Sequence, residues 1–414
     1  MGEVMRASFV TLYKIIAMLW ALCVWNGATF AEAPTPFAAK DNPANWVFVF
    51  KMNAGVFPST EVIADRSCLF GGTVQPYGQF SQRYAVASST APTLVDGSGL
   101  VGSGADAVGA TFAQIYSGQL HYVVWNDQFY RHPEISGCAE SCSGPWGHSK
   151  GVLAWNDDGE GVVLQVTTPS WPGAGNKAHP RSGEGNTLGC ISNNNVKFSQ
   201  HFFALKLSAS DVEKVLDALA TASVVTNPND PMIVQNGGPA VIQAMARALG
   251  KKSQATTATS IVLSSGVRLI AKPSNLAVPP WQMVSALLGG IDLRTATWWA
   301  NPTIPSTTRA TAIACWAPGL ITPGAVDNAA TGSWAGKSIG LKGGPAPNSN
   351  HAKIGISVSG SYSIFGDLNQ QGALSGNCKR SQNGRGGLFF VVDNAALHDS
   401  MKALIAGDSV PTAP

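Results

Sequence analysis

The sequence predicts a mixed α/β fold built in two halves, and three observations carry that prediction. Short apolar runs bounded by Gly, Asn, Asp and Pro recur along the chain, as strands and turns do. Segments with apolar residues at helical spacing follow these runs in both halves. A His-x-Lys motif leads into an apolar run once in each half, at His148 and Lys150 and again at His351 and Lys353.

Length and composition are typical of a large, folded, loop-rich protein. A chain of 414 residues with 45% hydrophobic side chains can bury one large core or two ordinary ones, because single cores rarely grow beyond roughly 250 to 300 residues. The 45 glycines, 25 prolines and only 12% charged residues suit an exported protein better than a helical cytosolic one. Two compact halves are therefore the expectation.

The first 31 residues have the pattern of a signal peptide. Arg6 and Lys14 precede an apolar run at residues 15–25, and small residues follow at Ala28 and Ala31, so we expect cleavage after Ala31. The apolar run is shorter than the roughly 20 residues that span a bilayer, and no later stretch is long enough. We therefore expect export and no membrane anchor once the signal is removed.

The charge balance gives little information about partners. Without the signal, the net charge is about +2 by count of Lys, Arg, Asp and Glu. Proteins that bind DNA irrespective of sequence usually concentrate basic residues on one face, and this balance permits a local basic cleft without demonstrating one. Charge alone does not indicate nucleic acid.

The cysteines favour disulfides. Cys23 lies in the signal, and the other six are Cys68, Cys138, Cys142, Cys190, Cys315 and Cys378. An even number in an exported chain is typical of disulfides, although the sequence does not choose among the possible pairings. The alternative is a zinc site at Cys138 and Cys142 near His148, but a second close-spaced Cys or His pair is absent.

The elements of the first half read as mostly sheet. Asp211 and Glu213 in a first turn, followed by apolar residues at helical spacing, predict a helix over residues 208–223, and a second helix is expected over residues 238–249. Strands are expected at residues 46–50, 121–125, 151–155 and 161–166.

The second half repeats the mixture. Strands are expected at residues 260–263, 267–271, 353–357 and 387–392, and a terminal helix at residues 395–405. Residues 226–231 contain one Asn-Pro and one Asp-Pro step and are the best candidate linker. The expected organisation is thus a signal at residues 1–31, a first half at 32–226 and a second half at 227–414.

The two His-x-Lys motifs suit phosphodiester chemistry. Residues two apart in a strand project from the same face, so each His and its Lys can meet one ligand together. Phosphoryl transfer needs a nucleophile or base, an acid and positive charge, which two imidazoles and two ammonium groups supply without a cofactor or metal. A single His-x-Lys is usually structural or exposed, whereas two copies at matching strand entries among seven histidines favour a paired catalytic site.

From about residue 46 to the C-terminus, the chain resembles the deoxyribonuclease II family of the phospholipase D superfamily. The similarity extends beyond the motifs, since the order and spacing of several segments also agree. These segments are NWVFVFK at residues 45–51, WNDQ at 125–128, GHSKGVL at 147–153, NTLGCIS at 186–192 and FGDLNQ at 365–370.

This resemblance implies fold, activity and location. It implies two tandem phospholipase D-like sandwich halves, with mixed sheets flanked by helices, related by a pseudo-twofold axis and sharing one site. The implied reaction is metal-independent cleavage of DNA at acid pH to 3′-phosphate and 5′-hydroxyl ends, in which one histidine attacks phosphorus and the other acts as acid and then base. A lysosomal location is implied in a eukaryote, and periplasm or medium in a bacterium. The chain is expected as a monomer or a homodimer.

The resemblance is incomplete at several positions. The superfamily places an Asp five residues after the Lys of its motif, but Trp155 and Val358 stand there. Asn369 lies where the superfamily contacts phosphate, and Asp367 is the candidate orienter of a histidine. Thr167 is a further candidate phosphate contact, and Trp146, beside the first motif, is the preferred aromatic for stacking on a base.

The remaining polar candidates have ordinary expected roles. Asn126 and Asp127 are expected to hold a hairpin turn, and the histidines without a paired Lys to be structural or exposed: His121, His132, His179, His201 and His398. Trp171, Trp298 and Trp299 are expected in the core more than at a base-stacking platform. Two other functions stay open: another phosphodiesterase of the phospholipase D superfamily, and a non-catalytic DNA-binding or uptake protein.

Overall fold

The computed structural model describes most of the chain after the expected signal. Residues 33–414 form one compact unit, Ala33–Pro414. The predicted signal peptide, Cys68, Cys190, His132, His179 and the segment at 186–192 lie outside the described residues, which are 32–59, 79–102, 104–115, 119–130, 135, 138, 140–169, 171 and 196–413.

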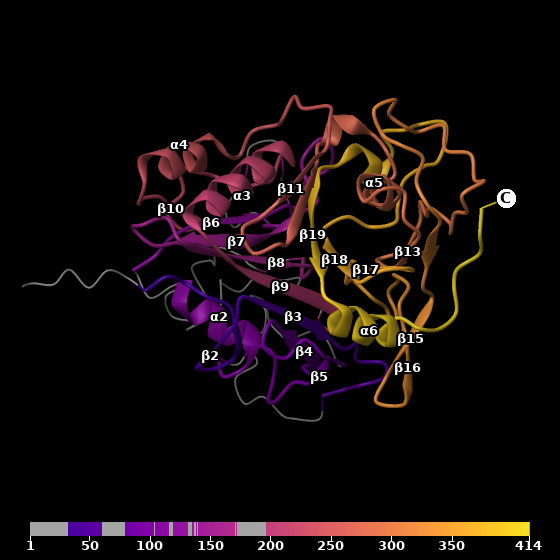
Figure 1. The fold of residues 1–414 in the computed structure, drawn as a ribbon, viewed down its shortest axis with the longest axis horizontal. Coiled ribbons are helices and arrows are strands. Elements are labelled where there is room, and N and C mark those ends of the chain that lie inside the picture. Colours follow the sequence, from indigo (N-terminus) through magenta and orange to yellow (C-terminus); the bar gives the residue numbers. More distant parts are fainter. Residues whose placement is uncertain are drawn as a thin grey trace, which may run out of the picture. The chain divides into compact units, whose positions relative to one another are not determined.

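Two large sheets dominate the unit, as expected for a mixed α/β fold (Figure 1). The first has eight strands in the order β10-β6-β7-β8-β9-β3-β4-β5, and all of its neighbours pair antiparallel. Its strands are β3 (Trp46–Lys51), β4 (Tyr84–Ser88), β5 (Val95–Asp96), β6 (His121–Asn126), β7 (Lys150–Trp155), β8 (Gly161–Val166), β9 (Gln200–Leu207) and β10 (Val234–Gln235).

The second sheet has seven strands in the order β11-β12-β19-β18-β17-β13-β14, antiparallel except for the β13–β14 pair. These strands are β11 (Thr259–Val262), β12 (Arg268–Lys272), β13 (Leu293–Ala296), β14 (Val326–Asn328), β17 (Ile354–Ser357), β18 (Tyr362–Gly366) and β19 (Gly387–Asp393). Two small hairpins join β1 (Phe37–Ala39) to β2 (Asn42–Pro43) and β15 (Thr331–Trp334) to β16 (Lys337–Gly340).

Helices cover the sheets. The Ser208 side chain caps α3 (Ala209–Thr221) by accepting from the Asp211 N–H, and α3 contacts β8 and β9 of one sheet and β12 and β19 of the other. Asn394 caps α6 (Ala395–Leu404) in the same way, and α6 contacts β17 and β18. The other helices are α2 (Ala107–Ile115), α4 (Ala240–Ala248), α5 (Pro280–Leu287) and the 3-10 turns η2 (Ser274–Leu276) and η3 (Ser381–Gly384).

Aromatic side chains join the two sheets face to face. The Phe365 ring of β18 stacks on Phe48 of β3 and on Phe203 of β9, with centroids 4.5 Å apart in both pairs. Phe203 also contacts Phe390 of β19 at 5.4 Å. Rings that bury this much apolar surface dominate the packing of a core, so the central strands of the two sheets are held as one body.

The central strands of the two sheets correspond in order. In each sheet, a His-x-Lys motif leads into the second of five neighbouring strands, and the fifth strand ends in a buried lysine. These strands are β6-β7-β8-β9-β3, which end at Lys51, and β13-β17-β18-β19-β12, which end at Lys272. The pseudo-twofold relation and the division at residues 226/227 stay predictions. Strand β10 and helix α4, which follow that division in sequence, pack with β6 and α3 of the first half.

Two disulfides confirm the expected use of the described cysteines. Cys138 bonds to Cys142, where a zinc site was the alternative, and Cys315 bonds to Cys378. In the described part of the chain, no helix combines the length and apolarity that crossing a bilayer requires.

Candidate active site

Each of the two motif histidines is anchored by a carbonyl at the end of a strand of the other sheet. His148, just before β7, donates from Nδ1 to the carbonyl of Asp367, which follows β18, at 2.8 Å. His351, just before β17, donates from Nδ1 to the carbonyl of Thr167, which follows β8, at 2.7 Å. Because β8 is in the first sheet and β18 in the second, the two anchors are reciprocal, and the motifs lie at one site between the sheets.

The backbone N–H groups of the two motif histidines are held in the same reciprocal way. The His148 N–H donates to the carbonyl of Gly386 at 2.8 Å, directly before β19. The His351 N–H donates to the carbonyl of Ser199 at 2.8 Å, directly before β9. Each histidine is therefore fixed by a backbone and a ring hydrogen bond from the other half.

These anchors determine the tautomers. A carbonyl can only accept, so the proton of each neutral imidazole is on Nδ1 and Nε2 has the lone pair. Burial first, and then the charge of Lys150, lower the pKa of His148 well below its ordinary value. Burial and then Lys353 do the same to the pKa of His351, and Lys150 and His148 add to the effect. Lys150 and His148 affect the pKa of His351 because the two motifs lie close together.

Lys150 has a buried carboxylate partner, Asp127. The antiparallel register pairs Asn126 of β6 with Lys150 of β7, so Asp127, the next residue, lies beside the lysine. Lys150 Nζ donates to Asp127 Oδ1 at 2.6 Å, and Arg385 Nη2 donates to Asp127 Oδ2 at 2.9 Å. Burial alone would raise the pKa of Asp127, but Lys150, His148 and Arg385 outweigh it and hold that pKa below its usual range.

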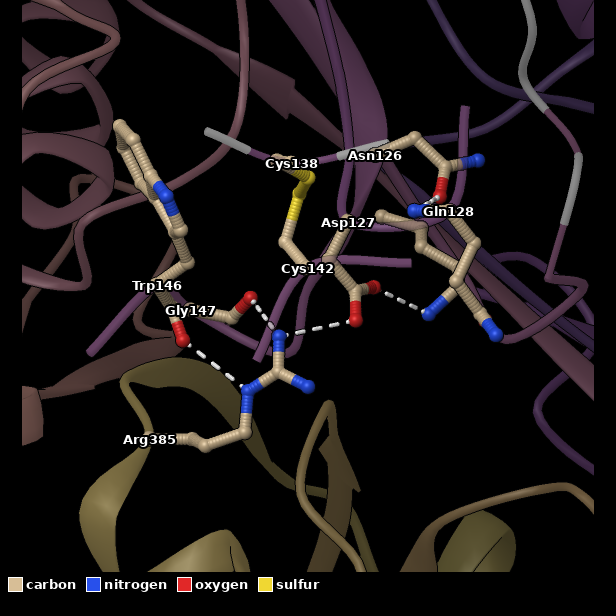
Figure 2. Close-up of a disulfide and its surroundings, with 9 residues drawn as sticks. Asn126, Asp127, Gln128, Cys138, Cys142, Trp146, Gly147 and Arg385 are labelled. Atoms are coloured by element: carbon tan, nitrogen blue, oxygen red, sulfur yellow. Dashed lines mark hydrogen bonds and ion pairs between the residues drawn. A yellow bond between two sulfur atoms is a disulfide. The ribbon is translucent and has the colours of Figure 1, made fainter. Parts of the chain in front are cut away.

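Arg385 extends this ion cluster to the loop before His148. Its Nε donates to the Trp146 carbonyl at 3.0 Å, and its Nη2 donates to the Gly147 carbonyl at 2.6 Å (Figure 2). Arg385 precedes β19 in the second half, so the guanidinium crosses between halves. The loop, the carboxylate and Lys150 are thus held by one buried side chain.

Lys353 has no equivalent carboxylate. Its Nζ donates to the His351 carbonyl at 2.6 Å and makes no ion pair with a described residue. Nζ also lies 3.2 Å from His351 Nδ1, but that atom carries the proton donated to Thr167, so we regard this distance as a contact of two donors. Burial and then Lys150 lower the pKa of Lys353 well below its ordinary value. Asp367 and Asp127 raise the pKa of Lys353 in part, but neither forms an ion pair with its Nζ, so this buried charge is compensated less directly than that of Lys150.

A chain of hydrogen-bonded polar groups connects the two motifs. The Lys353 N–H donates to His201 Nδ1 at 3.1 Å, which places the His201 proton on Nε2. His201 Nε2 in turn faces Gln165 Oε1 at 3.4 Å, and Gln165 Nε2 donates to Asp367 Oδ1 at 3.0 Å. Burial raises the pKa of Asp367 to about 7, against the Ser149 and Leu388 hydrogen bonds that lower it.

The predicted substrate-contact residues differ in their hydrogen-bond partners. Asp367 orients His148, although through its carbonyl and not its carboxylate. The Thr167 hydroxyl is engaged inside the protein, with Gln200 Oε1 at 2.8 Å and the His201 N–H at 2.9 Å. Asn369 is buried and donates to Gln371 at 2.8 Å. Contacts of Thr167 and Asn369 with phosphate stay predictions.

The aromatic candidates also differ in position. Trp146 is 9% exposed, with Lys252 Nζ 5.4 Å from its ring centroid, and its role in base stacking stays a prediction. Trp171 packs against Phe112 and Phe202 in the core, as expected. Trp298 lies edge-on to the His351 ring at 5.2 Å and is the aromatic in direct contact with the site.

Two residues beside the first motif, Asp127 and Arg385, have roles that the sequence does not predict. Asp127 is expected only to help hold a turn; Asn126 does so, accepting from the Gln128 N–H at 2.8 Å, but Asp127 is buried in the ion cluster. His201 has a structural role, as expected, since its Nδ1 accepts from the Lys353 N–H. The WNDQ segment was a usable signal for Asp127, whereas nothing in the sequence pairs Arg385 with it.

One of three comparisons with known proteins, a family profile, agrees with the similarity found in the sequence. No curated protein matches the chain. A structure of a mutant yeast tyrosyl-DNA phosphodiesterase is similar with a TM-score of 0.33 and 8% identity, covering 69% of this chain and 87% of that one. A profile described as deoxyribonuclease II matches residues 74–407, a span that contains both motifs, Asp127, His201 and Arg385.

Proposed function

The chain belongs to the deoxyribonuclease II family, and from this we propose that it is an exported, metal-independent acid endonuclease that leaves 3′-phosphate and 5′-hydroxyl ends. The family makes it a nuclease, a phosphodiester hydrolase that acts on DNA. The observation that supports the finer proposal is the reciprocal anchoring of His148 and His351, which leaves each Nε2 for chemistry.

In the proposed first step, the neutral Nε2 of one histidine attacks phosphorus. A P–N bond forms and the bond from phosphorus to the 5′ oxygen breaks, while the protonated second histidine gives that oxygen its proton. The 5′-hydroxyl strand leaves, and a phosphohistidine holds the 3′ side. In the second step, the now neutral second histidine takes a proton from water, whose oxygen attacks phosphorus and breaks the P–N bond.

The two lysines have different parts in this proposal. Lys353, a buried amine without a carboxylate partner in the described chain, is suited to the non-bridging oxygens of the phosphate, which would supply its missing counter-charge. Lys150 is already paired with Asp127, so its charge is fixed in place before DNA arrives. Positive charge held in advance stabilises a pentavalent phosphate without reorganisation.

The acid optimum follows from the histidine environments. Burial and neighbouring lysines lower the pKa of both imidazoles, so both are neutral in the free enzyme near pH 7. The reaction needs one of them protonated, and bound DNA raises their pKa because it is negatively charged. Activity should therefore rise as the pH falls below 7 and decline again when the nucleophile becomes protonated.

The proposal is tested by digesting supercoiled plasmid at pH 5 with excess EDTA and labelling the product ends. We expect wild type to cut in EDTA and to leave 3′-phosphates, and His148→Ala and His351→Ala each to be inactive. Loss of cutting in EDTA would indicate a metal-dependent enzyme. Binding of DNA without cutting by wild type would favour the non-catalytic alternative, and cleavage of lipid phosphodiesters in place of DNA the other phosphodiesterase.

A further inference from the structure

A cavity is lined in part by Arg385 and by the loop that precedes His148. It has a volume of about 600 Å³ and is lined by residues of both halves, among them Ser143 and Pro145 from the first and Lys379, Ser381 and Arg385 from the second. The described lining contains two cationic side chains and no carboxylate. Its hydroxyls and cations are donors, which suits an anion.

Arg385 presents an unused donor at this cavity. Its Nε and Nη2 are occupied by the Trp146 and Gly147 carbonyls and by Asp127, whereas Nη1 has no partner among the described residues. In Figure 2, the third nitrogen of the guanidinium has no dashed contact. The Arg385 side chain is only 10% exposed and lines the cavity. Its Nη1 can therefore donate to a ligand bound there.

We propose that this cavity is a second phosphate-binding site, which holds a backbone phosphate of the DNA through Arg385 Nη1 and Lys379 while the neighbouring scissile phosphate lies at the histidines. Phosphate is the anion of choice because guanidinium groups bind it with directed, charge-assisted hydrogen bonds. This inference rests on the proposed function for the identity of its substrate.

The position of Arg385 gives this site a route to the chemistry. Two consecutive ion pairs, Arg385 to Asp127 at 2.9 Å and Asp127 to Lys150 at 2.6 Å, connect the cavity with the first motif. Arg385 also holds the two carbonyls directly before His148. A phosphate in the cavity is thus bound by the same side chain that positions the catalytic loop.

The test measures DNA binding without turnover, so it does not depend on the cleavage mechanism. The parent is the full chain with His148→Ala and His351→Ala, and binding of a fluorescent duplex is followed by anisotropy at pH 5 over a range of salt concentrations. Adding Lys379→Ala should weaken binding roughly three- to tenfold and reduce the slope of log K against log salt by about 0.9, the value for one phosphate contact.

Arg380→Ala is the matched control. Arg380 is the exposed neighbour of Lys379, has the same charge and does not line the cavity, so its removal should change affinity and salt slope less. Equal effects of the two variants would show only a diffuse positive field and would overturn the proposal. No effect of Lys379→Ala would overturn it as well.

A second arm separates DNA from free phosphate. Inorganic phosphate is titrated into the parent and into the Lys379→Ala variant by calorimetry. Weaker binding of inorganic phosphate by the variant, together with its weaker DNA binding, supports a site for the phosphates of DNA. If only inorganic phosphate responds to Lys379→Ala, the cavity takes a free phosphate and the proposal is wrong, while the nuclease activity stays untouched.

Discussion

At the scale of single residues, the two halves of the site are chemically unequal. Lys150 forms an ion pair with Asp127, which is itself shared with Arg385, whereas Lys353 Nζ donates to a carbonyl and forms no ion pair with a described residue. Asp127, which follows β6, lies beside Lys150, and Trp298, which follows β13, contacts His351. One lysine is fixed by an ion pair, and the other is buried without one.

Replacing Lys353 by Met should slow cleavage by roughly 10²- to 10³-fold, as the loss of one preorganised charge does in comparable sites. Lys353 also helps to lower the pKa of His351, so the variant should have a higher His351 pKa. If His351 is the acid, the alkaline limb of the pH–rate profile moves to higher pH; if it is the nucleophile, the acid limb does.

The exposed Lys342 provides the control for that variant, since Lys342→Met removes the same charge outside the site. This variant should keep the wild-type rate and both limbs of the pH–rate profile at their wild-type positions. A Lys353→Met profile with both limbs in their wild-type positions would mean that this amine does not act on the histidine.

Asp127→Asn should destabilise the protein strongly. It leaves Lys150 and Arg385 without their carboxylate, and breaking a buried ion pair costs roughly 3 to 5 kcal/mol. Asp96→Asn makes the same chemical change in the exposed pair with Arg83 and should cost below about 1 kcal/mol. Urea unfolding at pH 6 measures both, and similar losses would contradict the role of Asp127.

The catalytic role of the two His-x-Lys pairs stays a prediction, but their meeting at one place could be expected from the sequence because each motif is local and repeated. The contacts of Asp127, Arg385 and His201 could not be expected, since their partners are brought to them by strand register and by the packing of one sheet on the other. Asp127 follows β6 and Arg385 precedes β19, so only the assembled sheets show that a residue expected in a turn has a buried charge partner.

At the scale of elements, Asp367 connects β18 to its neighbours. Its carboxyl accepts from the Leu388 N–H at the start of β19 and from Gln165 of β8. Burial raises its pKa to about 7, above the unfolded value near 4, so this group binds a proton more tightly in the folded state. Its contribution to stability is complete below about pH 4 and is lost as the pH rises to about 7.

Asp367→Asn removes this titration. The unfolding free energy of wild type relative to the variant should therefore fall between pH 4 and pH 7, by roughly a few kcal/mol in total. Parallel urea titrations of the two proteins across this range measure it, and titration of the histidines cancels in the difference. A constant difference across the range would show that the carboxyl is ionised in the folded protein.

Elements with a strong local pattern could be predicted from the sequence within one or two residues. Strands β3, β6, β8 and β19 are continuous apolar runs, and α3 has a cap, an acidic first turn and an apolar face. Strand β9, helix α5 and the short strands β13 to β16 were not predicted. Strand β9 begins with the polar residues Gln200 and His201, which contact the motifs, so its start lacks an apolar pattern. Helix α5 has only eight residues, too few for a clear helical pattern, so tertiary packing decides the conformation of both segments.

At the scale of the whole molecule, the two sheets supply one another's catalytic contacts. The carbonyls that orient the rings and the carbonyls that hold the motif backbones all come from strand ends of the other sheet. One sheet alone does not supply all of these contacts. The central claim is therefore that His148 and His351 belong to a single catalytic unit and not to two independent ones.

A double-mutant cycle on kcat/KM at pH 5 tests this claim most directly, with His148→Ala, His351→Ala and the variant that carries both changes. In a single site, each single variant should lose nearly all activity, and the double variant should be little worse, because residues that act together are strongly non-additive. Single variants that each keep about half of the wild-type activity would contradict the account, since each half would then cut DNA alone.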